Sequence, residues 1–282
     1  MPELPEVETV RRTLAPALVD RRIARATLHR PDFCERPDHR PCTPRDLLEG
    51  LTVRSLERRG KQLAILSREG PLLVAHLGMT GQLRIAGPGH RQDHIHAEWT
   101  LGGGGRLTFR DARRFGGLWA LPAETDLRAR WSLLGPDGLD VTAADLRARA
   151  GESRRAIKAA LLDQATVAGV GNIYADEALF LARIHPMRPA RSLRDPEWRN
   201  LAAAIQRTLN AAIGAGGSTL RDYVNALGVP GRAQADHAVY ARRGEECLAC
   251  RGRLRGARVG GRATVYCPRC QPRRASGIVK KP

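Results

Sequence analysis

Four cysteines near the C-terminus have the spacing of a metal site. They form two Cys-x2-Cys pairs separated by 16 residues, Cys247, Cys250, Cys267 and Cys270. Two such pairs are typical of a zinc ribbon, in which four thiolates hold one Zn²⁺ tetrahedrally, whereas a pair of disulfides is disfavoured in a cytosolic protein. Because four thiolates leave no open coordination position, we expect a structural zinc. Cys34 and Cys42 lack this spacing and are expected to be ordinary thiols.

The N-terminus carries a candidate nucleophile. Proline in second position normally permits removal of Met1, which would leave Pro2 with a secondary amine of pKa about 8. Such an amine can attack a sugar aldehyde carbon, and the resulting iminium makes the neighbouring C–H acidic, so that the 3′ and then the 5′ phosphate can be eliminated. Glu3 would lie beside it as proton donor and acceptor. Alternatively, Pro2 and Pro5 only begin a helix, and Glu3, Glu6 and Glu8 favour its dipole.

A third group of residues lies where a turn joins two predicted helices. The first helix ends near Gln164, and Val170-Gly171-Asn172 opens the second. Backbone N–H groups and the Asn172 amide at a helix N-terminus can bind an anion such as a DNA phosphate. Helical hairpins with glycine turns are also common in ordinary cores, so this pattern alone leaves both interpretations open.

The charge balance indicates a polyanionic partner. The 282 residues include 47 basic and 29 acidic side chains, which gives a formal net charge of +18. Lys and Arg on a folded protein release counterions from a phosphate backbone, so nucleic acid is the expected partner. Few of the basic residues are lysines, and Lys61 follows Arg58-Arg59-Gly60, which indicates that an ammonium is preferred there.

The apolar pattern argues against a membrane or secreted protein. No apolar run approaches the roughly 18 residues of a membrane span, and the N-terminus lacks the layout of a signal peptide. We therefore expect a cytoplasmic, nucleoid-associated protein.

Hydrophobic periodicity predicts an α+β chain. A helix is expected over Glu6–Leu18, followed by short alternating runs from about Ile23 to Leu121 that predict a β-sandwich or barrel, with Gly102–Gly105 as a turn between two strands. Apolar residues at helical spacing then predict a mainly helical region, with helices over 143–150, 154–164, 173–183 and 196–214.

The domain boundaries follow from these changes of pattern. We predict an N-terminal β-sandwich with a leading helix over 1–135, a helical domain over 143–228, a zinc-ribbon β-hairpin over 237–271, and a basic, disordered tail over 272–282.

Several motifs, taken together and in order, resemble the formamidopyrimidine-DNA glycosylase family. They are Met1–Val10, His76–Gly81, Asp111–Gly116, Gly169–Phe180 and the four-cysteine tail, so the match runs from residue 1 to about 271. The resemblance implies a helix-two-turn-helix domain and one structural Zn²⁺. It also implies a monomeric base-excision repair enzyme for double-stranded DNA. Such an enzyme removes 8-oxoguanine and formamidopyrimidines, then cleaves the abasic site by β- and δ-elimination.

The resemblance also assigns roles to individual residues. Pro2 matches the family's nucleophile and Glu3 its proton donor. Lys61 falls on the lysine assigned to β-elimination and Arg262 on the arginine assigned to δ-elimination. Physically, we expect these two cations to act mainly by binding phosphates and holding the strand bent.

Further residues match positions that contact DNA in the family. Met79, Arg113 and Phe115 match the trio that fills the space left by the extruded nucleotide, which offsets the few kcal/mol that extrusion costs. Without the resemblance, Met79 and Phe115 would be assigned to the core. The other implied DNA-binding residues are His76, His94, Lys158 and Asn172, with His96 as the alternative to His94.

Two positions depart from the family pattern. Ala233 stands where the family usually has an aromatic, in the loop that would cover the flipped base, so the preference between 8-oxoguanine and ring-opened purines is left open. Ala241 replaces a frequent glycine, and a small residue there should be tolerated.

Two rival functions remain. The first is the endonuclease VIII branch of the same superfamily, which acts on oxidised pyrimidines, although Leu4, the trio and Val170–Tyr174 favour the purine branch. The second is a non-catalytic basic zinc-ribbon protein that binds DNA or RNA, which would leave Pro2 and Glu3 without a function.

Overall fold

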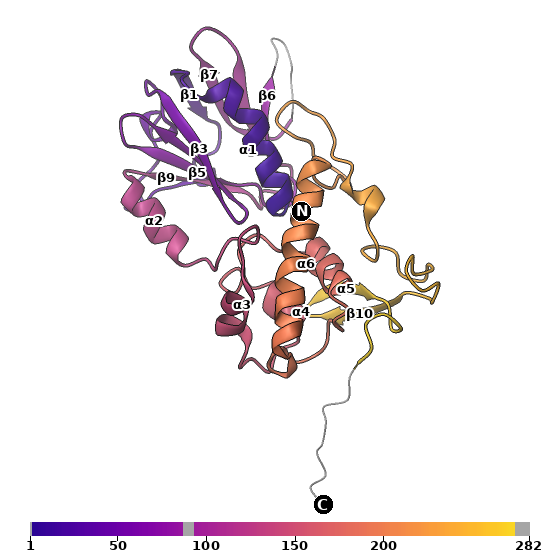
Figure 1. Cartoon of the computed structure of the whole chain (residues 1–282). Coiled ribbons are helices and arrows are strands. Elements are labelled where there is room, and N and C mark those ends of the chain that lie inside the picture. Colours follow the sequence, from indigo (N-terminus) through magenta and orange to yellow (C-terminus); the bar gives the residue numbers. More distant parts are fainter. Residues whose placement is uncertain (1, 87–92, 274–282) are drawn as a thin grey trace, which may run out of the picture. The chain divides into compact units, whose positions relative to one another are not determined.

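The computed structural model describes residues 2–86 and 93–273 (Figure 1). The chain forms two compact units. The first contains the chain up to Leu133 together with Ala212–Gln234, and the second contains Leu134–Ala211 and the chain from Ala235 onward. Residues 274–282, most of the tail predicted to be disordered, lie outside the described ranges.

The first unit is a β-sandwich preceded by a helix. Its elements are α1 (Leu4–Leu18), β1 (Ile23–Leu28), β2 (Cys34–Glu35), β3 (Val53–Arg59), β4 (Gln62–Ser67), β5 (Leu72–His76), β6 (Gln82–Ala86), β7 (Ile95–Leu101), β8 (Arg106–Arg110), β9 (Gly117–Leu121) and α2 (Glu124–Ser132). One sheet has the order β1-β7-β8-β6 and the other β2-β9-β5-β4-β3, with all neighbours antiparallel except β2 and β9. The predicted sandwich with a leading helix is confirmed, as is the turn at Gly102–Gly105 between β7 and β8.

The core of this unit lies on both faces of β4 and β5. One face contributes Leu63, Ile65 and Leu73 to the main hydrophobic cluster, on which α1 also packs through Val7, Val10 and Leu14. The other face packs against α2 through Leu127. The sequence pattern did not predict α2, because Leu127 is its buried residue and one position forms no apolar stripe.

The second unit is mainly helical and ends in a β-hairpin. Its elements are α3 (Ala143–Ala150), α4 (Ile157–Leu161), α5 (Asn172–Leu181), α6 (Asp195–Gly214, whose end belongs to the first unit), β10 (Arg255–Val259) and β11 (Arg262–Tyr266), with short 3₁₀ turns at Ala190–Ser192 and Ala233–Asp236. The predicted helical region and hairpin are confirmed. The helix predicted over 154–164 is shorter, and it ends at Leu161 because the side chains of Asp163 and Gln164 bond to the backbone of the following turn.

Within the described ranges, none of the helices has the length and apolarity that crossing a membrane requires. The proposed domain boundaries stay a prediction, because the compactness of a unit does not show that the corresponding stretch folds on its own.

Candidate functional site

The two residues predicted to do chemistry, Pro2 and Glu3, are buried immediately before α1. The Glu3 N–H donates a hydrogen bond to Glu6 Oε2 at 2.7 Å, and the Ser218 N–H donates to Glu6 Oε1 at 2.7 Å. Glu6 is almost fully buried. Its carboxylate therefore fixes the backbone beside the candidate nucleophile relative to the loop that follows α6.

Tyr223 strengthens the same connection. Its hydroxyl lies 3.2 Å from the Glu6 carbonyl oxygen and 3.1 Å from that of Gly216. Burial, and then the charge of Glu6, raises the pKa of Tyr223, so the hydroxyl stays protonated and can donate. Ala233, where the family usually has an aromatic, is buried at the base of this loop and its N–H donates to the Gly217 carbonyl.

Lys61 lies in the two-residue turn between β3 and β4. Gly60 has a φ of +56°, as the first central position of a type II′ hairpin turn requires. The next residue, Gln62, pairs with His76 on β5. Burial, and then the charges of Lys61 and Arg130, lower the pKa of His76, so its imidazole is neutral at pH 7. The hydrogen bond that Gly78 N–H donates to His76 Nδ1 at 3.3 Å requires that neutral form.

The carboxylate of Asp111 organises the segment that carries Arg113 and Phe115. It accepts hydrogen bonds from the N–H groups of Gly116 at 2.7 Å and Arg113 at 3.2 Å, and from the Thr80 hydroxyl. Asp111 is fully buried, and no apolar residue could satisfy these donors.

The same segment touches the backbone that precedes Met79. A Cβ atom added to Gly78 would lie 2.3 Å from the Phe115 carbonyl carbon, so the two segments can approach this closely only with glycine at position 78. The Arg113 guanidinium lies over the Phe115 ring, 4.8 Å from its centroid. Phe115 is 54% exposed, which argues against a plain core role. The structure thus brings the predicted trio to one place, and its contact with DNA stays a prediction.

His94 and His96 differ in their exposure to solvent. His96 is buried, with Nε2 at 2.7 Å from the Asp111 carbonyl oxygen and its ring 4.5 Å from that of Phe33. His94 is exposed, with a left-handed φ of +65°. His94 is therefore the histidine of the two that can reach a ligand.

In the second unit, Gln164 shapes the turns that precede Asn172. Its Oε1 accepts from Gly169 N–H at 2.9 Å, and its Nε2 donates to the Val170 carbonyl at 2.9 Å. Asn172 begins α5, and its buried Oδ1 has no hydrogen-bond partner among the described residues. An amide side chain at the N-terminus of a helix suits an anion site.

The side chain of Lys158 is buried in an ion pair, whereas a lysine that binds a DNA phosphate must be accessible from the surface. Its side chain is 0% exposed, with Nζ 2.8 Å from Asp176 Oδ1, and it donates to Thr264 Oγ1 at 2.8 Å and to the Ala263 carbonyl at 2.9 Å. Asp176 Oδ2 also accepts from Val265 N–H at 3.0 Å. Burial, opposed by Lys158, raises the pKa of Asp176 to about 6. Direct DNA binding by Lys158 stays a prediction, and it would require this pair to open.

The buried pair connects Arg262 to the helices. Arg262 begins β11 and is exposed, directly before the residues that Lys158 and Asp176 hold. The turn at Gly260 packs against Ala159 on α4. Asp176 lies one helical turn after Asn172, on the same face of α5. The Lys158–Asp176 pair therefore joins the helix that begins at Asn172 to the strand that begins at Arg262, the two predicted phosphate ligands of this unit.

The four predicted metal ligands come together. Their Sγ atoms all lie within 4.8 Å of one another, with 3.4 Å between Cys250 and Cys267 and 3.9 Å between Cys247 and Cys270. Zn–S bonds of about 2.3 Å in a tetrahedron place sulfur atoms about 3.8 Å apart. The cluster fits one structural Zn²⁺ held by four thiolates.

We expect one zinc per chain by metal analysis of the purified protein, and a loss of that zinc in a Cys247→Ser variant, because three thiolates no longer complete the tetrahedron. Cys34→Ser is the matched control, since burial, and then Cys42, raises the pKa of the Cys34 thiol and keeps it from acting as a ligand. Two disulfides without metal would contradict the assignment.

The sequence predicts only a helix-dipole role for Glu6 and Glu8, and it gives no individual role to Arg58, Asp111 or Asp176. One signal was present: Asp176 and Glu177 are adjacent acidic residues in a mostly apolar helix, and a buried charge needs a partner. Ser218, a partner of Glu6, and Thr80, a partner of Asp111, lie too far away along the chain for spacing to reveal them.

Family models match almost the whole chain. The formamidopyrimidine-DNA glycosylase N-terminal domain matches residues 1–118, the H2TH domain of the same glycosylase matches 134–224, and the zinc finger found in FPG and IleRS matches 244–273.

Named relatives agree with these models. The formamidopyrimidine-DNA glycosylase of Laribacter hongkongensis is 45% identical over 280 residues, covering 96% of this chain and all of that protein, and the Bacillus subtilis enzyme is 41% identical over 278 residues. The crystal structure of MutM (Fpg) from Thermus thermophilus matches with a TM-score of 0.84 at 41% identity, covering 96% of this chain and 98% of that one. Lactococcus lactis Fpg in complex with DNA containing an abasic site matches with a TM-score of 0.87 at 33% identity, covering 96% of this chain and all of that one. This chain belongs to the formamidopyrimidine-DNA glycosylase family.

Proposed function

We propose that this protein is a bifunctional DNA glycosylase and abasic-site lyase that excises 8-oxoguanine and formamidopyrimidines and then cleaves the strand by β,δ-elimination. The main support for the proposal is the way in which the N-terminal residues are buried and held in place. Pro2 and Glu3 are buried immediately before α1, and the Glu6 carboxylate links the Glu3 backbone to the loop at Ser218. A helix that needed only a start signal would not require this link across more than two hundred residues.

The chemistry follows from the positions of these two groups. After removal of Met1, the Pro2 nitrogen attacks C1′ of the damaged nucleotide, the base departs, and an iminium forms as the sugar ring opens. Ring opening needs a proton donor and the elimination needs a base for the C2′ proton, and Glu3 is the adjacent group that can serve both. Loss of the C2′ proton expels the 3′ phosphate, and a second elimination expels the 5′ phosphate.

The remaining predicted residues would bind and deform the DNA. Lys61, with His76 and His94, would contact the strand from the first unit, and Arg262 with Asn172 would clamp phosphates from the second. Met79, Arg113 and Phe115 would occupy the space of the extruded nucleotide. Zn²⁺ would act only by folding the hairpin that presents Arg262. Lactococcus lactis Fpg has been solved with DNA that contains Fapy-dG, which supports a ring-opened purine as one substrate here.

We further propose that the protein acts as a monomer on chromosomal DNA in the cytoplasm. The pyrimidine-specific branch of the superfamily is the alternative substrate class. The small Ala233 in the loop after α6 departs from the family pattern, and it bears on the preference between 8-oxoguanine and ring-opened purines.

The test is a comparison of two duplexes under single-turnover conditions. We expect the zinc-loaded protein to release the base from an 8-oxoguanine·cytosine duplex faster than from a dihydrouracil duplex, and to leave phosphate at both ends of the gap. Faster release of dihydrouracil would assign the protein to the pyrimidine branch. Tight binding with no base release from either duplex would leave a DNA-binding function without catalysis.

A further inference from the structure

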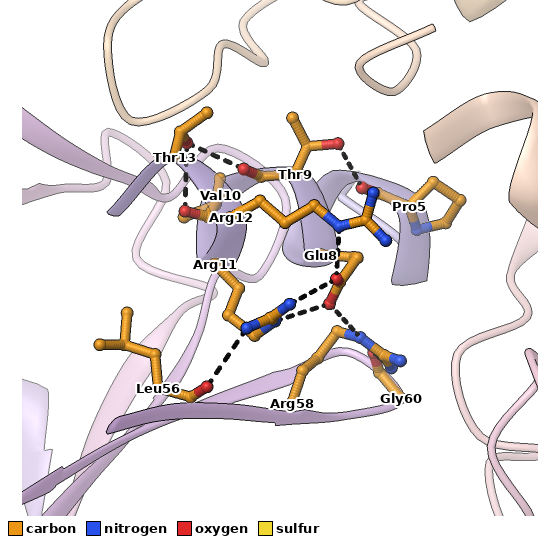
Figure 2. Close-up of polar contacts among 10 residues, drawn as sticks. All are labelled: Pro5, Glu8, Thr9, Val10, Arg11, Arg12, Thr13, Leu56, Arg58 and Gly60. Carbon is orange, nitrogen blue, oxygen red and sulfur yellow. Dashed lines mark hydrogen bonds and ion pairs between the residues drawn. The ribbon is translucent and has the colours of Figure 1, made fainter. Parts of the chain in front are cut away.

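A buried cluster around Glu8 connects α1 to the turn that carries Lys61 (Figure 2). Glu8 lies in the second turn of α1 and is nearly buried. Its Oε1 accepts hydrogen bonds from Arg11 at 2.8 Å and Arg12 at 2.7 Å, and its Oε2 accepts from Arg58 at 3.1 Å. Burial opposes the charge on Glu8, but these guanidiniums outweigh it and lower its pKa to about 2, so the carboxylate is ionised at physiological pH.

Arg58 differs from the other two arginines in origin and in exposure. Arg11 and Arg12 lie on the same helix as Glu8, whereas Arg58 comes from β3. The side chain of Arg58 is 7% exposed and that of Arg12 is 58% exposed. The Arg12 guanidinium keeps most of its contact with solvent, whereas burying the Arg58 guanidinium is costly unless its hydrogen-bond geometry is well satisfied. Besides Glu8, the Arg58 guanidinium contacts the turn between β3 and β4.

The Nη1 group of Arg58 donates to the Gly60 carbonyl at 3.0 Å. Gly60 directly precedes Lys61, so this bond fixes the peptide group that places the Lys61 backbone. A lysine side chain has four rotatable bonds, and the position of its ammonium depends on how well its Cα is held. The rigid, planar fork of arginine can hold a carboxylate and a carbonyl at once, which a lysine cannot reproduce.

We propose that Arg58 is a positioning residue for Lys61: it fixes the β3–β4 turn, through Glu8, to the helix that begins directly after Pro2 and Glu3. The inference rests on the proposed function, because Lys61 is the residue through which Arg58 would affect DNA. It assigns no contact with DNA to Arg58 itself. Glu8 is the anchor, and Arg58 links the N-terminal nucleophile to the predicted phosphate ligand of the same unit.

The test is a double-mutant cycle with two readouts. The first is the rate constant of covalent capture of a preformed abasic duplex in borohydride. The second is the salt dependence of binding to a duplex with a reduced abasic site, which cannot form an iminium. Arg58→Met is compared in the wild-type chain and in a Lys61→Met chain. Arg12→Met is the matched control, because Arg12 binds the same carboxylate and, among the contacts described, none reaches the turn.

We expect Arg58→Met to slow covalent capture by about ten- to a hundredfold in the wild-type chain, the range that a misplacement of about 1 Å produces. In the Lys61→Met chain the same change should alter the rate by no more than about twofold, because the ligand it positions is gone. The plot of log K against log salt has a negative slope, and Arg58→Met should reduce its magnitude by up to about 0.9. The magnitude should be no smaller in the double variant than in Lys61→Met alone. Arg12→Met should leave both readouts unchanged.

Several outcomes would overturn the inference. A further loss of rate from Arg58→Met in the Lys61→Met chain would indicate a general structural role, and a further fall in the salt slope there would indicate that Arg58 binds a phosphate directly. No effect of Lys61→Met on either readout would remove the residue that Arg58 is meant to position.

The design allows for a variant that does not fold and for a wild-type protein that shows no covalent capture. Glu8 keeps Arg11 and Arg12 when Arg58 is removed, and Arg58→Lys enters the same cycle if Arg58→Met does not fold. Absence of covalent capture by the wild-type protein would contradict the proposed function, and the binding cycle would then decide on Arg58 by itself.

Discussion

Moving the terminal amine by one residue is expected to slow covalent capture of abasic DNA by about a hundredfold or more. A Pro2→Gln variant keeps Met1, because a bulky second residue prevents its removal, so the amine is displaced by one residue from its native position. The backbone at Glu3 cannot follow, since its N–H is bonded to Glu6, which is bonded to Ser218. A displacement of only about 1 Å can cost about a hundredfold in rate. The measurement is the rate of adduct formation in borohydride.

Two further variants test this explanation. Pro2→Gly keeps a terminal amine at the same position but makes it a primary amine, so it should retain part of the rate that Pro2→Gln loses. Pro37→Gln, at an exposed proline of the same unit, should capture DNA as the wild-type protein does. Equal rates for Pro2→Gln and the wild-type protein would show that the amine at position 2 is not the nucleophile.

Replacing Lys158 by Met is expected to lower the free energy of unfolding by about 3–5 kcal/mol, the usual loss when one partner of a buried ion pair is removed. Asp176 would remain fully buried, with Val265 N–H as a remaining donor but without its counter-charge. The measurement is a urea titration of the zinc-loaded protein, with midpoint and slope compared with those of the wild-type protein. The exposed pair of Arg147 and Asp195 is the control, and Arg147→Met should change stability by less than about 1 kcal/mol.

The dependence of this loss on pH identifies its cause. The pKa of Asp176 is already raised above its value in the unfolded chain, and loss of Lys158 would raise it further. A group whose pKa is higher in the folded state favours folding at low pH, and that contribution is lost as the pH rises through the folded pKa. The difference between Lys158→Met and the wild-type protein should therefore be smaller at pH 5 than at pH 8.

A double variant separates the pair from the packing. Lys158→Met combined with Asp176→Leu should recover most of the lost stability, because no unpaired charge stays buried. Equal losses at both pH values, with no recovery in the double variant, would contradict the account and would indicate that Lys158 contributes through its aliphatic stem alone.

The sequence could predict the features that depend on local spacing. The Cys-x2-Cys pairs predicted the thiolate cluster, and the position of Val7, Val10 and Leu14 predicted α1, because helix period and knuckle length are properties of a short stretch. The alternating runs predicted the sandwich for the same reason. The resemblance added the trio of Met79, Arg113 and Phe115, of which Met79 and Phe115 would otherwise have been assigned to the core.

The features that spacing could not predict depend on residues far apart in the chain. Lys158 stands out in the sequence as a rare lysine, but its partners at 176, 263 and 264 become visible only when α4, α5 and β11 meet. The sequence predicts a helix-dipole role for Glu6, whereas in the structure its carboxylate binds Ser218, which lies in a loop more than two hundred residues later. Arg58 reads as one surface arginine among many, although its side chain is buried between Glu8 and Gly60.

The proposed mechanism requires that the Pro2 nitrogen become covalently bound to C1′ of the damaged nucleotide. This bond can be located by trapping the protein on an 8-oxoguanine·cytosine duplex with borohydride, digesting the adduct with protease and nuclease, and identifying the modified peptide by mass spectrometry. We expect the sugar remnant to be attached to the peptide that begins at Pro2. Attachment to a peptide that contains Lys61 would contradict it, as would an N-terminal peptide that still carries Met1 in a protein that cleaves the duplex.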